Sequence, residues 1–581
     1  MCGLFFCENI DNQILNLSTL RSHLRQRGRD EYNELKYVGN LFIHSRLSIN
    51  ALNENGSQPY NGRKLVILFN GEIYNYHELV IQHDLNIGSN QNYSECCVIE
   101  AIIERYGVQK GASLFRGMFA VIIYDKSSGS ITFFRDQFGI KPLFFKSSNE
   151  GIQISSLASL LKVSDECISK NSLTHFLNYG SVSSLEPVYQ NVICVQPGYI
   201  YTHTNNYVTY SKYGEGFNYN KKCTNKLIQL EKILADEIIL NSVSDVKCGI
   251  LLSGGVDSAL LASLWQKYVK KPIIAYNLSF TNSVVDESER AKDIANKLNL
   301  QYKIITIDET RLEGYFTEFI SVMDQPSIDG FNTYLITKSI DDDIKVLLSG
   351  AGADELFLGY DFYKHIVVRP KVRKILTGLM RKIHSLRPNR FTEKYIYGHL
   401  GIDAALQYKR SSYRICDTTT ELFDADKLSE NIQSLRDYET KTYLRDTILF
   451  DSDQAGLANG KEIRPVFLSQ HVYSFAESLD ANEMISDKFT KLILKKMVSN
   501  LLPNVSFFDT KKKGFELPYA NFLNETLHGY VGGELDRFQY SKYRDIIDYN
   551  MLKRKWSIKK FSNGDWRSII LVCWLNKQMI V

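Results

Sequence analysis

The second residue of the chain combines a nucleophile with a base. Cys2 follows the initiator Met directly, and because Cys is small, removal of Met1 leaves Cys2 as the first residue. Its α-amino group then lies beside its own thiol, and an α-amine titrates near neutrality. One residue can therefore carry both a thiolate and the base that activates it, which suits acyl transfer. A cysteine at this position is more often a chance buried residue, so the prediction depends on the rest of the domain.

Two glycine-rich runs predict a site for a charged ligand. LLSGGVDS (251–258) and LLSGAGADE (347–355) each follow an apolar run. Successive small residues let backbone N–H groups turn toward an anion, and a helix N-terminus adds a favourable dipole. Asp257 and Asp354 are the hard oxygen ligands that bridge Mg²⁺ to phosphates. A tight turn and, for Asp354 with Glu355, an acidic pair at a helix N-terminus are the simpler alternatives.

The elements that position Cys2 are short and rich in strands. Up to about residue 210, apolar runs such as KLVILFNGEIYN, MFAVIIYD and SITFFRD alternate with turns. This pattern predicts antiparallel sheets packed on one another or on helices. A polar, aperiodic stretch, SKYGEGFNYNKKCTN, comes next and is typical of a linker. We therefore predict domains at 1–210 and 211–581.

The elements around the glycine-rich runs have a different rhythm. From about residue 225, apolar strand-like runs alternate with helical patterns, which predicts a parallel sheet with helices on its faces. Such sheets bind ligands at the carboxyl ends of their strands, where both glycine-rich runs fall. From about residue 360 the pattern is mainly helical, without obvious strands. The predicted fold class is α/β in two domains.

Composition excludes several classes of protein. Lys and Arg total 69 against 65 Asp and Glu, so the balance gives no reason to expect nucleic acid as a partner. The ten cysteines show neither CxxC pairs nor zinc-site spacing, which indicates reduced thiols in a cytoplasmic protein. The N-terminus lacks a basic leader, and the apolar tail SIILVCWL is too short to span a bilayer.

Five ordered blocks after Cys2 carry a family resemblance. They are HSRLSI (44–49), QPY (58–60), FNGEIYN (69–75), GMFAVIIYD (117–125) and RDQFGIKPLFF (135–145). Together they resemble the class II glutamine amidotransferase domain of the glutamine-hydrolysing asparagine synthetases. The resemblance implies an N-terminal-nucleophile fold, an α-β-β-α sandwich in which Cys2 attacks the side-chain amide of glutamine.

The resemblance also implies roles for other residues of this domain. Asn70 and the N–H of Gly71 would form the oxyanion hole, Arg46 would bind the glutamine carboxylate, and Glu72 would help to hold the substrate. The chemistry agrees, because a guanidinium pairs with a carboxylate bidentately and fixed donors stabilise an oxyanion. Taken singly, Arg46 could form a surface salt bridge and Asn70-Gly71 a hairpin turn.

One position departs from the family pattern. The family usually has Ser-Asp where this chain has Ser94-Glu95, and that aspartate binds the α-amino group of glutamine. Glu95 keeps the carboxylate on an arm one methylene longer, so the efficiency of glutamine hydrolysis is less predictable than its presence. We interpret His44 as a packed or hydrogen-bonded histidine.

The second domain resembles the ATP pyrophosphatases that carry a PP-loop. SGGVDS at a strand-to-helix junction lacks the Lys of a Walker loop and matches the PP-loop instead. In the synthetase domain, Asp257 and Asp354 would hold Mg²⁺, and Lys491 would contact the reacting phosphate and acyl oxygens. Taken alone, Lys491 could simply be an exposed lysine on a surface helix. The resemblance places ATP against Leu252, Ser253, Gly254, Gly255, Asp257, Ser258, Leu278, Ser349 and Gly350.

These two domains imply one overall reaction with small-molecule partners. A carboxylate attacks ATP to give an acyl-adenylate, and ammonia released at Cys2 displaces AMP to leave an amide. Ammonia would be protonated in bulk water, so a dry passage should connect the sites. Two alternatives remain: a cyclase that forms an intramolecular amide, like the β-lactam and lasso-peptide enzymes, and a non-catalytic regulator that binds glutamine or ATP. Such cyclases typically lose the N-terminal Cys, and retained Asp257 and Lys491 argue against a regulator.

The sequence does not identify the carboxylic acid that accepts the ammonia. Asparagine synthetases usually carry Glu where this chain has Ala351, and that acid handles the adduct and ammonia. A methyl group neither binds ammonium nor accepts a proton. LAN (457–459) and Ser469 depart from the family pattern as well, whereas Glu462 and Arg464 read as a structural pair. Aspartate, a uronic acid sugar and a secondary-metabolite acid are all candidates.

A basic segment forms a further candidate surface. Residues 368–390 contain eight Lys or Arg and no acid, with apolar residues at helical spacing. The pattern predicts a helix with a solvated basic face; a weak membrane contact or a site for an anionic acceptor is the alternative. The oligomeric state is not fixed by the sequence, and a homodimer stays open.

Overall fold

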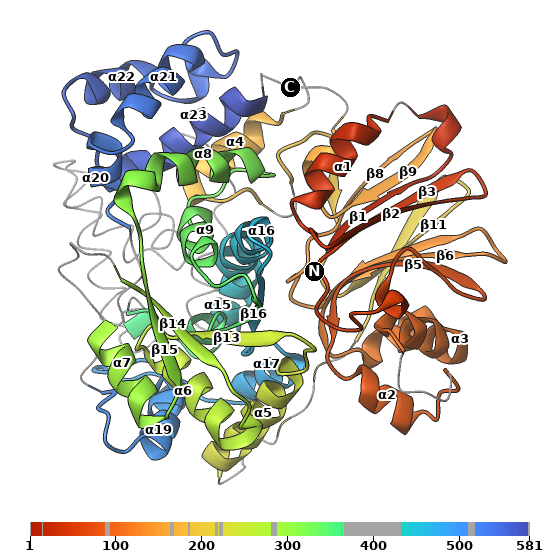
Figure 1. Cartoon of the computed structure of the whole chain (residues 1–581), viewed down its shortest axis with the longest axis horizontal. Coiled ribbons are helices and arrows are strands. Elements are labelled where there is room, and N and C mark those ends of the chain that lie inside the picture. The colour runs from red at the N-terminus through yellow and green to blue at the C-terminus, as the bar shows by residue number, and fades with distance from the viewer. Residues whose placement is uncertain are drawn as a thin grey trace, which may run out of the picture.

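A computed structural model describes residues 2–13, 15–87, 93–162, 168–183, 186–214, 216, 219, 225–279, 288–361, 363–364, 432–508 and 517–578. Two halves lie side by side (Figure 1). The first consists of two stacked antiparallel sheets with helices outside them, and the second is built around one parallel sheet. The predicted two-domain α/β architecture is therefore confirmed.

The first half is a sandwich of two six-stranded sheets. In spatial order, the first sheet contains β10 (Ile193–Cys194), β8 (Phe144–Ser148), β9 (Gly151–Ser155), β1 (Cys2–Cys7), β3 (Asn40–Arg46) and β2 (Glu31–Tyr37). The second contains β12 (Tyr207–Lys212), β11 (Tyr199–Thr204), β7 (Ile131–Arg135), β6 (Gly117–Asp125), β5 (Leu65–Ile73) and β4 (Tyr60–Asn61). Side chains of β1, β3, β5 and β6 fill the space between the sheets.

Helices cover the outer faces of this sandwich. They are α1 (Leu17–Arg25) on the first sheet and α2 (Tyr76–Gln82) with α3 (Glu95–Leu114) on the second (Figure 1). Every residue of β1 and of β5 is buried. This explains why their sequences are apolar runs rather than alternating ones, since both faces of each strand are covered. The α-β-β-α sandwich implied by the family resemblance is confirmed.

The second half contains a five-stranded sheet in which all strands are parallel. In order these are β15 (Gln301–Thr306), β14 (Ile274–Ser279), β13 (Lys247–Leu251), β16 (Ile344–Ser349) and β17 (Glu462–Pro465). The first four lie between residues 225 and 360, where apolar strand-like runs predict a parallel sheet. The absence of obvious strands after residue 360 was wrong for β17, whose two charged residues interrupt the apolar pattern, although all four of its residues are buried.

The helices of the second half surround this sheet and continue to the C-terminus. They are α4 (Lys170–Tyr179), which packs against this half, α5 (Lys226–Asn241), α6 (Val256–Leu264), α7 (Ser288–Lys297), α8 (Leu312–Val322), α9 (Gly330–Lys338), α10 (Ala353–Leu356), α15 (Ile432–Glu439), α16 (Phe450–Ala458), α17 (Gln470–Glu477), α18 (Ala481–Met484), α19 (Leu492–Leu501), α20 (Tyr519–Asn524), α21 (His528–Phe538), α22 (Tyr549–Ser557) and α23 (Trp566–Gln578). A π-helical segment, Thr440–Leu449, precedes α16.

Two sequence features have different outcomes in the structure. The apolar tail lies in α23, which is buried along almost its whole length. Within the described ranges, no helix is long and apolar enough to cross a membrane. The basic segment 368–390 lies outside the described residues, as does most of the predicted linker.

Candidate active site

The predicted nucleophile lies where the two halves meet. Cys2 opens β1, next to the N-terminal mark in Figure 1, and its register pairs it with Arg46 of β3. The N–H of Cys2 donates to Oδ1 of Asn70, which belongs to the facing sheet, over 2.8 Å. Three predicted glutamine-site residues from three strands and both sheets are thus brought together.

A cleft of about 390 Å³ opens beside Cys2. Arg46, Gly71, Glu72 and Glu95 line it, so it gathers the predicted glutamine-binding groups. Arg46 is buried, and its Nη2 donates to the backbone oxygen of Asn50 over 3.0 Å. Its Nη1 also pairs with Oε2 of Glu31 at 3.3 Å, so Arg46 forms a salt bridge, but with a buried guanidinium rather than on the surface.

The environment of Cys2 favours the thiolate. Burial raises the pKa of the thiol, but the adjacent ring of His44, through its charge and a hydrogen bond, and the backbone at Leu47 lower that pKa to about 6. His44 is buried, and its Nε2 lies 3.3 Å from the carbonyl oxygen of Phe69. It is hydrogen-bonded, as predicted, but the sequence did not indicate its contact with the nucleophile.

Asn70 and Gly71 lie inside β5 and not in a hairpin turn. Nδ2 of Asn70 is buried, with no hydrogen-bond partner among the described residues, while its Oδ1 is held by Cys2. A fixed donor beside the nucleophile is what an oxyanion hole requires. Gly71 has φ = 128°, and a Cβ there would lie 2.0 Å from the carbonyl oxygen of Met118, so only glycine fits.

Glu72 and Glu95 form an acid pair in the cleft. Burial and the charges of Glu95 and Glu462 raise the pKa of Glu72 well above its usual range, while Arg464 opposes the shift. Burial also raises the pKa of Glu95, to about 7, although Ile73 N–H donates to its Oε1 over 3.3 Å. Glu95 is therefore poised to ionise near neutrality and to bind a cation such as an α-ammonium group.

The first glycine-rich run forms the turn between β13 and α6. Oγ of Ser258 accepts from the N–H of Ser253 over 3.2 Å, and Gly255 N–H donates to Ser253 Oγ over 3.3 Å. The turn is thus held by its own hydroxyls, at the N-terminus of α6. Leu252 is buried in the core, whereas Leu278 at the end of β14 is half-buried.

The second glycine-rich run places Asp354 close to Asp257 of the first run. Lys491 Nζ lies 2.5 Å from Oδ2 of Asp257 and 2.7 Å from Oδ1 of Asp354. The two carboxylates therefore converge on one point at the edge of the parallel sheet. Gly350 makes this approach possible, because a Cβ there would lie 2.9 Å from Cβ of Asp257.

This donor set fits a magnesium ion that is shared with phosphates. Among the described residues, no group of three or more His, Cys, Asp or Glu side chains could hold a metal on its own. Two convergent carboxylates are what Mg²⁺ uses when substrate phosphates supply further ligands. Asp257 and Asp354 meet that requirement.

A residue of β17 in the second half contacts Glu72, which lines the glutamine cleft. Arg464 and Glu462 are fully buried and paired at 2.6 Å, as expected for a structural pair. In addition, Arg464 Nη2 lies 3.6 Å from Oε2 of Glu72. An ion pair at 2.6 Å also joins Arg27 of the first half to Asp453 of α16. The sequence alone did not indicate either contact between the halves.

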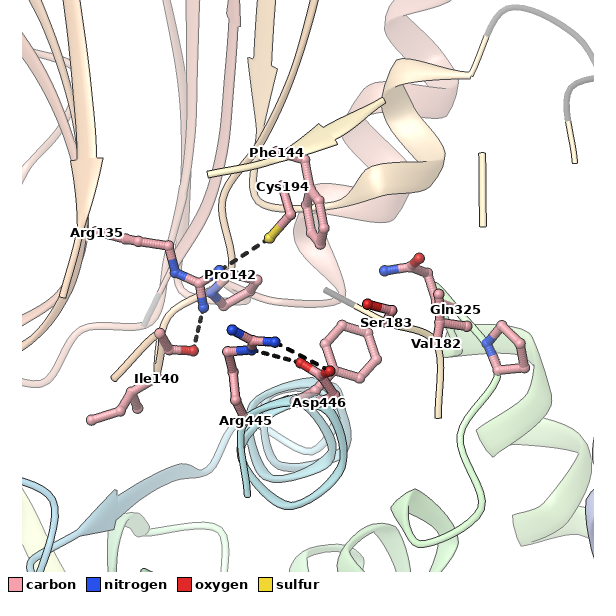
Figure 2. A pocket seen from close by; sticks show the side chains of 13 residues that line it. Arg135, Ile140, Pro142, Phe144, Val182, Ser183, Cys194, Gln325, Arg445 and Asp446 are labelled. Carbon is pink, nitrogen blue, oxygen red and sulfur yellow. Dashed lines mark hydrogen bonds and ion pairs between the residues drawn. The ribbon is translucent and has the colours of Figure 1, made fainter. Parts of the chain in front are cut away.

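Figure 2 shows a further cavity between the halves, of about 460 Å³. Ile140, Pro142 and Phe144 form its apolar wall, and an Arg445–Asp446 ion pair at 2.7 Å lies opposite. Its polar groups bind one another, so the geometry assigns it no chemistry of its own.

Comparison with known proteins agrees with this arrangement. The family model for asparagine synthase matches residues 229–576, and the model for a glutamine amidotransferase domain matches residues 1–214. An asparagine synthetase (glutamine-hydrolyzing) 1 from Bacillus subtilis strain 168 is 27% identical over 552 residues, which cover 88% of this chain and 85% of the relative. A putative asparagine synthetase (glutamine-hydrolyzing) from Mycobacterium bovis strain ATCC BAA-935 / AF2122/97 is 26% identical over 617 residues, covering 95% and 92%.

Among solved structures, a glutamine phosphoribosylpyrophosphate amidotransferase from B. subtilis matches 52% of this chain and 66% of that chain, with 12% identity and a TM-score of 0.27. The family matches, the fold and the glutamine cleft define a glutamine-dependent ligase. The chain belongs to the asparagine synthase family.

Proposed function

We propose that the protein activates a carboxylic acid with ATP and amidates it with ammonia from glutamine. Pyrophosphate leaves when the acyl-adenylate forms, and AMP leaves when ammonia attacks. The observation that carries this proposal is the convergence of Asp257, Asp354 and Lys491 at the carboxyl ends of the parallel strands, in a chain whose other half places Cys2 in a cleft lined by the predicted glutamine-binding groups.

In the first half, the thiolate of Cys2 attacks the side-chain amide carbon of glutamine. Asn70 Nδ2 and the N–H of Gly71 stabilise the oxyanion, and collapse of the adduct releases ammonia and leaves a thioester that water hydrolyses. Arg46 binds the α-carboxylate, and the acid pair faces the α-ammonium group. The thiol pKa of about 6 supports this role, because Cys2 is then largely ionised at neutral pH.

In the second half, ATP binds with its phosphates over the turn 253–258, at the N-terminus of α6. Asp257 and Asp354 would hold Mg²⁺, which neutralises phosphate charge when bound. Lys491 bridges these acids in the present structure and would turn to the α-phosphate and acyl oxygens once the metal takes up their charge.

The acceptor is a carboxylic acid: aspartate, a uronic acid sugar or a secondary-metabolite acid. Ala351 follows Gly350 in the same loop and presents only a methyl group, which supports an acceptor other than aspartate. Ammonia must reach this loop without entering bulk water, where it would be protonated. We therefore expect the amide nitrogen to travel inside the protein.

One assay tests the whole proposal. The protein is supplied with glutamine, ATP, Mg²⁺ and a panel of carboxylic acids that begins with aspartate, and products are followed by mass spectrometry. We expect AMP, pyrophosphate and one acid converted to its amide. Glutamine hydrolysis with no amide from any acid, or ADP in place of AMP, would contradict the proposal.

A further inference from the structure

A small cavity lies between the glutamine cleft and the ATP loop. Ile140 and Lys141 of the first half form one side of it, and its interior space of about 10 Å³ has room for a molecule the size of water. The second half supplies the remaining wall, formed by Ala351, Leu449, Ser452, Asp453, Ile463 and Pro465. We call it the Ala351 cavity.

Two sets of contacts fix its place between the sites. Along β17, Arg464 contacts Glu72 of the glutamine cleft, whereas the alternate residues Ile463 and Pro465 line the Ala351 cavity. On the opposite wall, Ala351 directly follows Gly350, which packs against Asp257. A molecule in the cavity therefore lies between the source of ammonia and the ATP loop.

Asp453 also connects this cavity to the nucleophile. Its Oδ2 accepts from Arg27 Nη2 over 2.6 Å, and Arg27 Nε donates to the backbone oxygen of Cys2 over 3.3 Å. These side chains are almost fully buried. The orientation of Asp453 is thus fixed from the glutaminase side.

The other oxygen of Asp453 has unused capacity. Oδ1 lies 3.6 Å from Lys141 Nζ, which is too long for a hydrogen bond, and neither atom has a hydrogen-bond partner within the described part of the chain. Both side chains are more than nine-tenths buried. Buried polar atoms without hydrogen-bond partners are rare, and here two of them, which form only a long ion pair with each other, lie at the wall of one cavity.

Amide formation needs a proton acceptor at this place. When ammonia attacks the acyl-adenylate, a C–N bond forms, the C–O bond to AMP breaks, and AMP leaves as an anion. The nitrogen enters with three protons and remains in the amide with two, so one proton must be transferred. Ala351 cannot accept it, and Asp453 is the acid among the described residues that line the cavity.

We propose that Oδ1 of Asp453 binds ammonia in the Ala351 cavity and accepts the proton that the nitrogen loses during attack. Arg27 and Lys141 flank the carboxylate and offset the cost of burying its charge. The proton then passes from Asp453 to solvent before the next catalytic cycle. This role rests on the proposed function, because it requires an acyl-adenylate in the second half.

The test uses Asp453→Asn in the full chain, with ammonium chloride as nitrogen source and the acid that the wild type amidates in the panel assay. We expect amide formation to fall at least about 10²-fold, the usual contribution of a general base. Glutamine hydrolysis and acid-dependent exchange of pyrophosphate into ATP should stay within about threefold, since neither step uses this proton acceptor. Asp343→Asn, which removes an acid from a mostly exposed pair with Lys247, should resemble the wild type in all three assays.

Two further measurements distinguish proton transfer by Asp453 from a structural role of this residue. They are a pH profile and a double variant in which the acid is moved to position 351. Corrected for the fraction of free ammonia, the variant's rate should keep rising with pH, because hydroxide must replace the lost base, while the wild-type rate levels off. Ala351→Glu in the Asp453→Asn background should recover at least tenfold, because it returns a carboxylate to the same cavity.

The outcomes are distinct. Unchanged amide formation in Asp453→Asn, an equal fall in all three activities, or a double variant no faster than Asp453→Asn would overturn the proposal and leave Asp453 as a contact between the halves. A wild type that amidates no acid would defeat the proposed function, and this inference with it.

Discussion

The two sites meet opposite electrostatic conditions. In the glutamine cleft, Asn70 keeps a buried donor without a partner among the described residues, and Glu95 is poised to ionise near neutrality. The carboxyl ends of β13 and β16 form the predicted ATP site, which we call the ATP edge. There, Lys491 pairs with both Asp257 and Asp354. The cleft thus keeps the Asn70 donor available for a ligand, although its Arg46 is paired with Glu31, whereas both acids at the ATP site are already paired with Lys491.

This difference separates two ways of preparing a site. Rigid strands position the glutamine groups before the substrate arrives, so little reorganisation remains for the reaction. At the ATP edge, a ligand must separate an existing ion pair, and phosphate and metal charges have to replace it. We therefore expect substitutions in the cleft to affect chemistry, and substitutions at the edge to affect binding and chemistry together.

The largest effect should come from the nucleophile. Cys2→Ala should lower glutamine-supported amide formation at least about 10⁴-fold, because no other group can form the thioester. Turnover with ammonium salts should continue, since ammonia then bypasses the cleft. An equal loss of amide formation with glutamine and with ammonium salts would show that the glutamine cleft does not simply supply ammonia to the second site.

The next effect should come from the acids at the ATP edge. Asp257→Asn should lower acid-dependent pyrophosphate release about 10³-fold, because it removes a charge from the Mg²⁺ site, while glutamine hydrolysis is largely retained. Asp343→Asn is the matched control. Asp343 pairs with Lys247 at 2.6 Å, but both side chains are mostly exposed, and such pairs contribute little. A loss of glutamine hydrolysis equal to that of pyrophosphate release would remove the distinction between the sites.

A smaller effect should come from the oxyanion donor. Asn70→Ala should lower kcat for glutamine hydrolysis about 10²-fold with little change in KM, since the donor acts on the adduct and not on bound glutamine. Steady-state kinetics at saturating glutamine measure this. A rise in KM at constant kcat would instead make Asn70 a binding residue.

The smallest effect concerns pH. Burial raises the pKa of Glu95 to about 7, so below that pH the carboxyl is neutral and cannot pair with the α-ammonium group. KM for glutamine should therefore fall severalfold as pH rises from about 6 to about 8. Glu95→Gln should have a higher KM with no such pH dependence. A wild-type KM that is constant over this range would show that Glu95 does not bind the substrate ammonium.

Sequence reasoning succeeded where a feature is local. The buried strands β1 and β5 are continuous apolar runs, and both glycine-rich loops come directly after strands. His44 could have been connected with the cleft, since strand alternation places it on the same face as Arg46.

Features that depend on distant segments were missed. Arg27 and Asp453 are 426 positions apart, and nothing near either residue predicts the other. The charged pattern of β17 is typical of exposed chain. Its burial depends on pairing within the strand and with Glu72, which only the assembled protein shows.

The position of β17 matters for anyone who recombines these domains. Although it lies far along the chain, its Arg464 contacts Glu72 of the glutamine cleft, and its Ile463 and Pro465 line the Ala351 cavity. A chimera that joins this glutaminase half to another synthetase half would replace the residue that contacts Glu72 of the cleft. Grafting Glu462–Pro465 together with residues 1–210 should therefore preserve the glutamine site better than exchange at the linker alone.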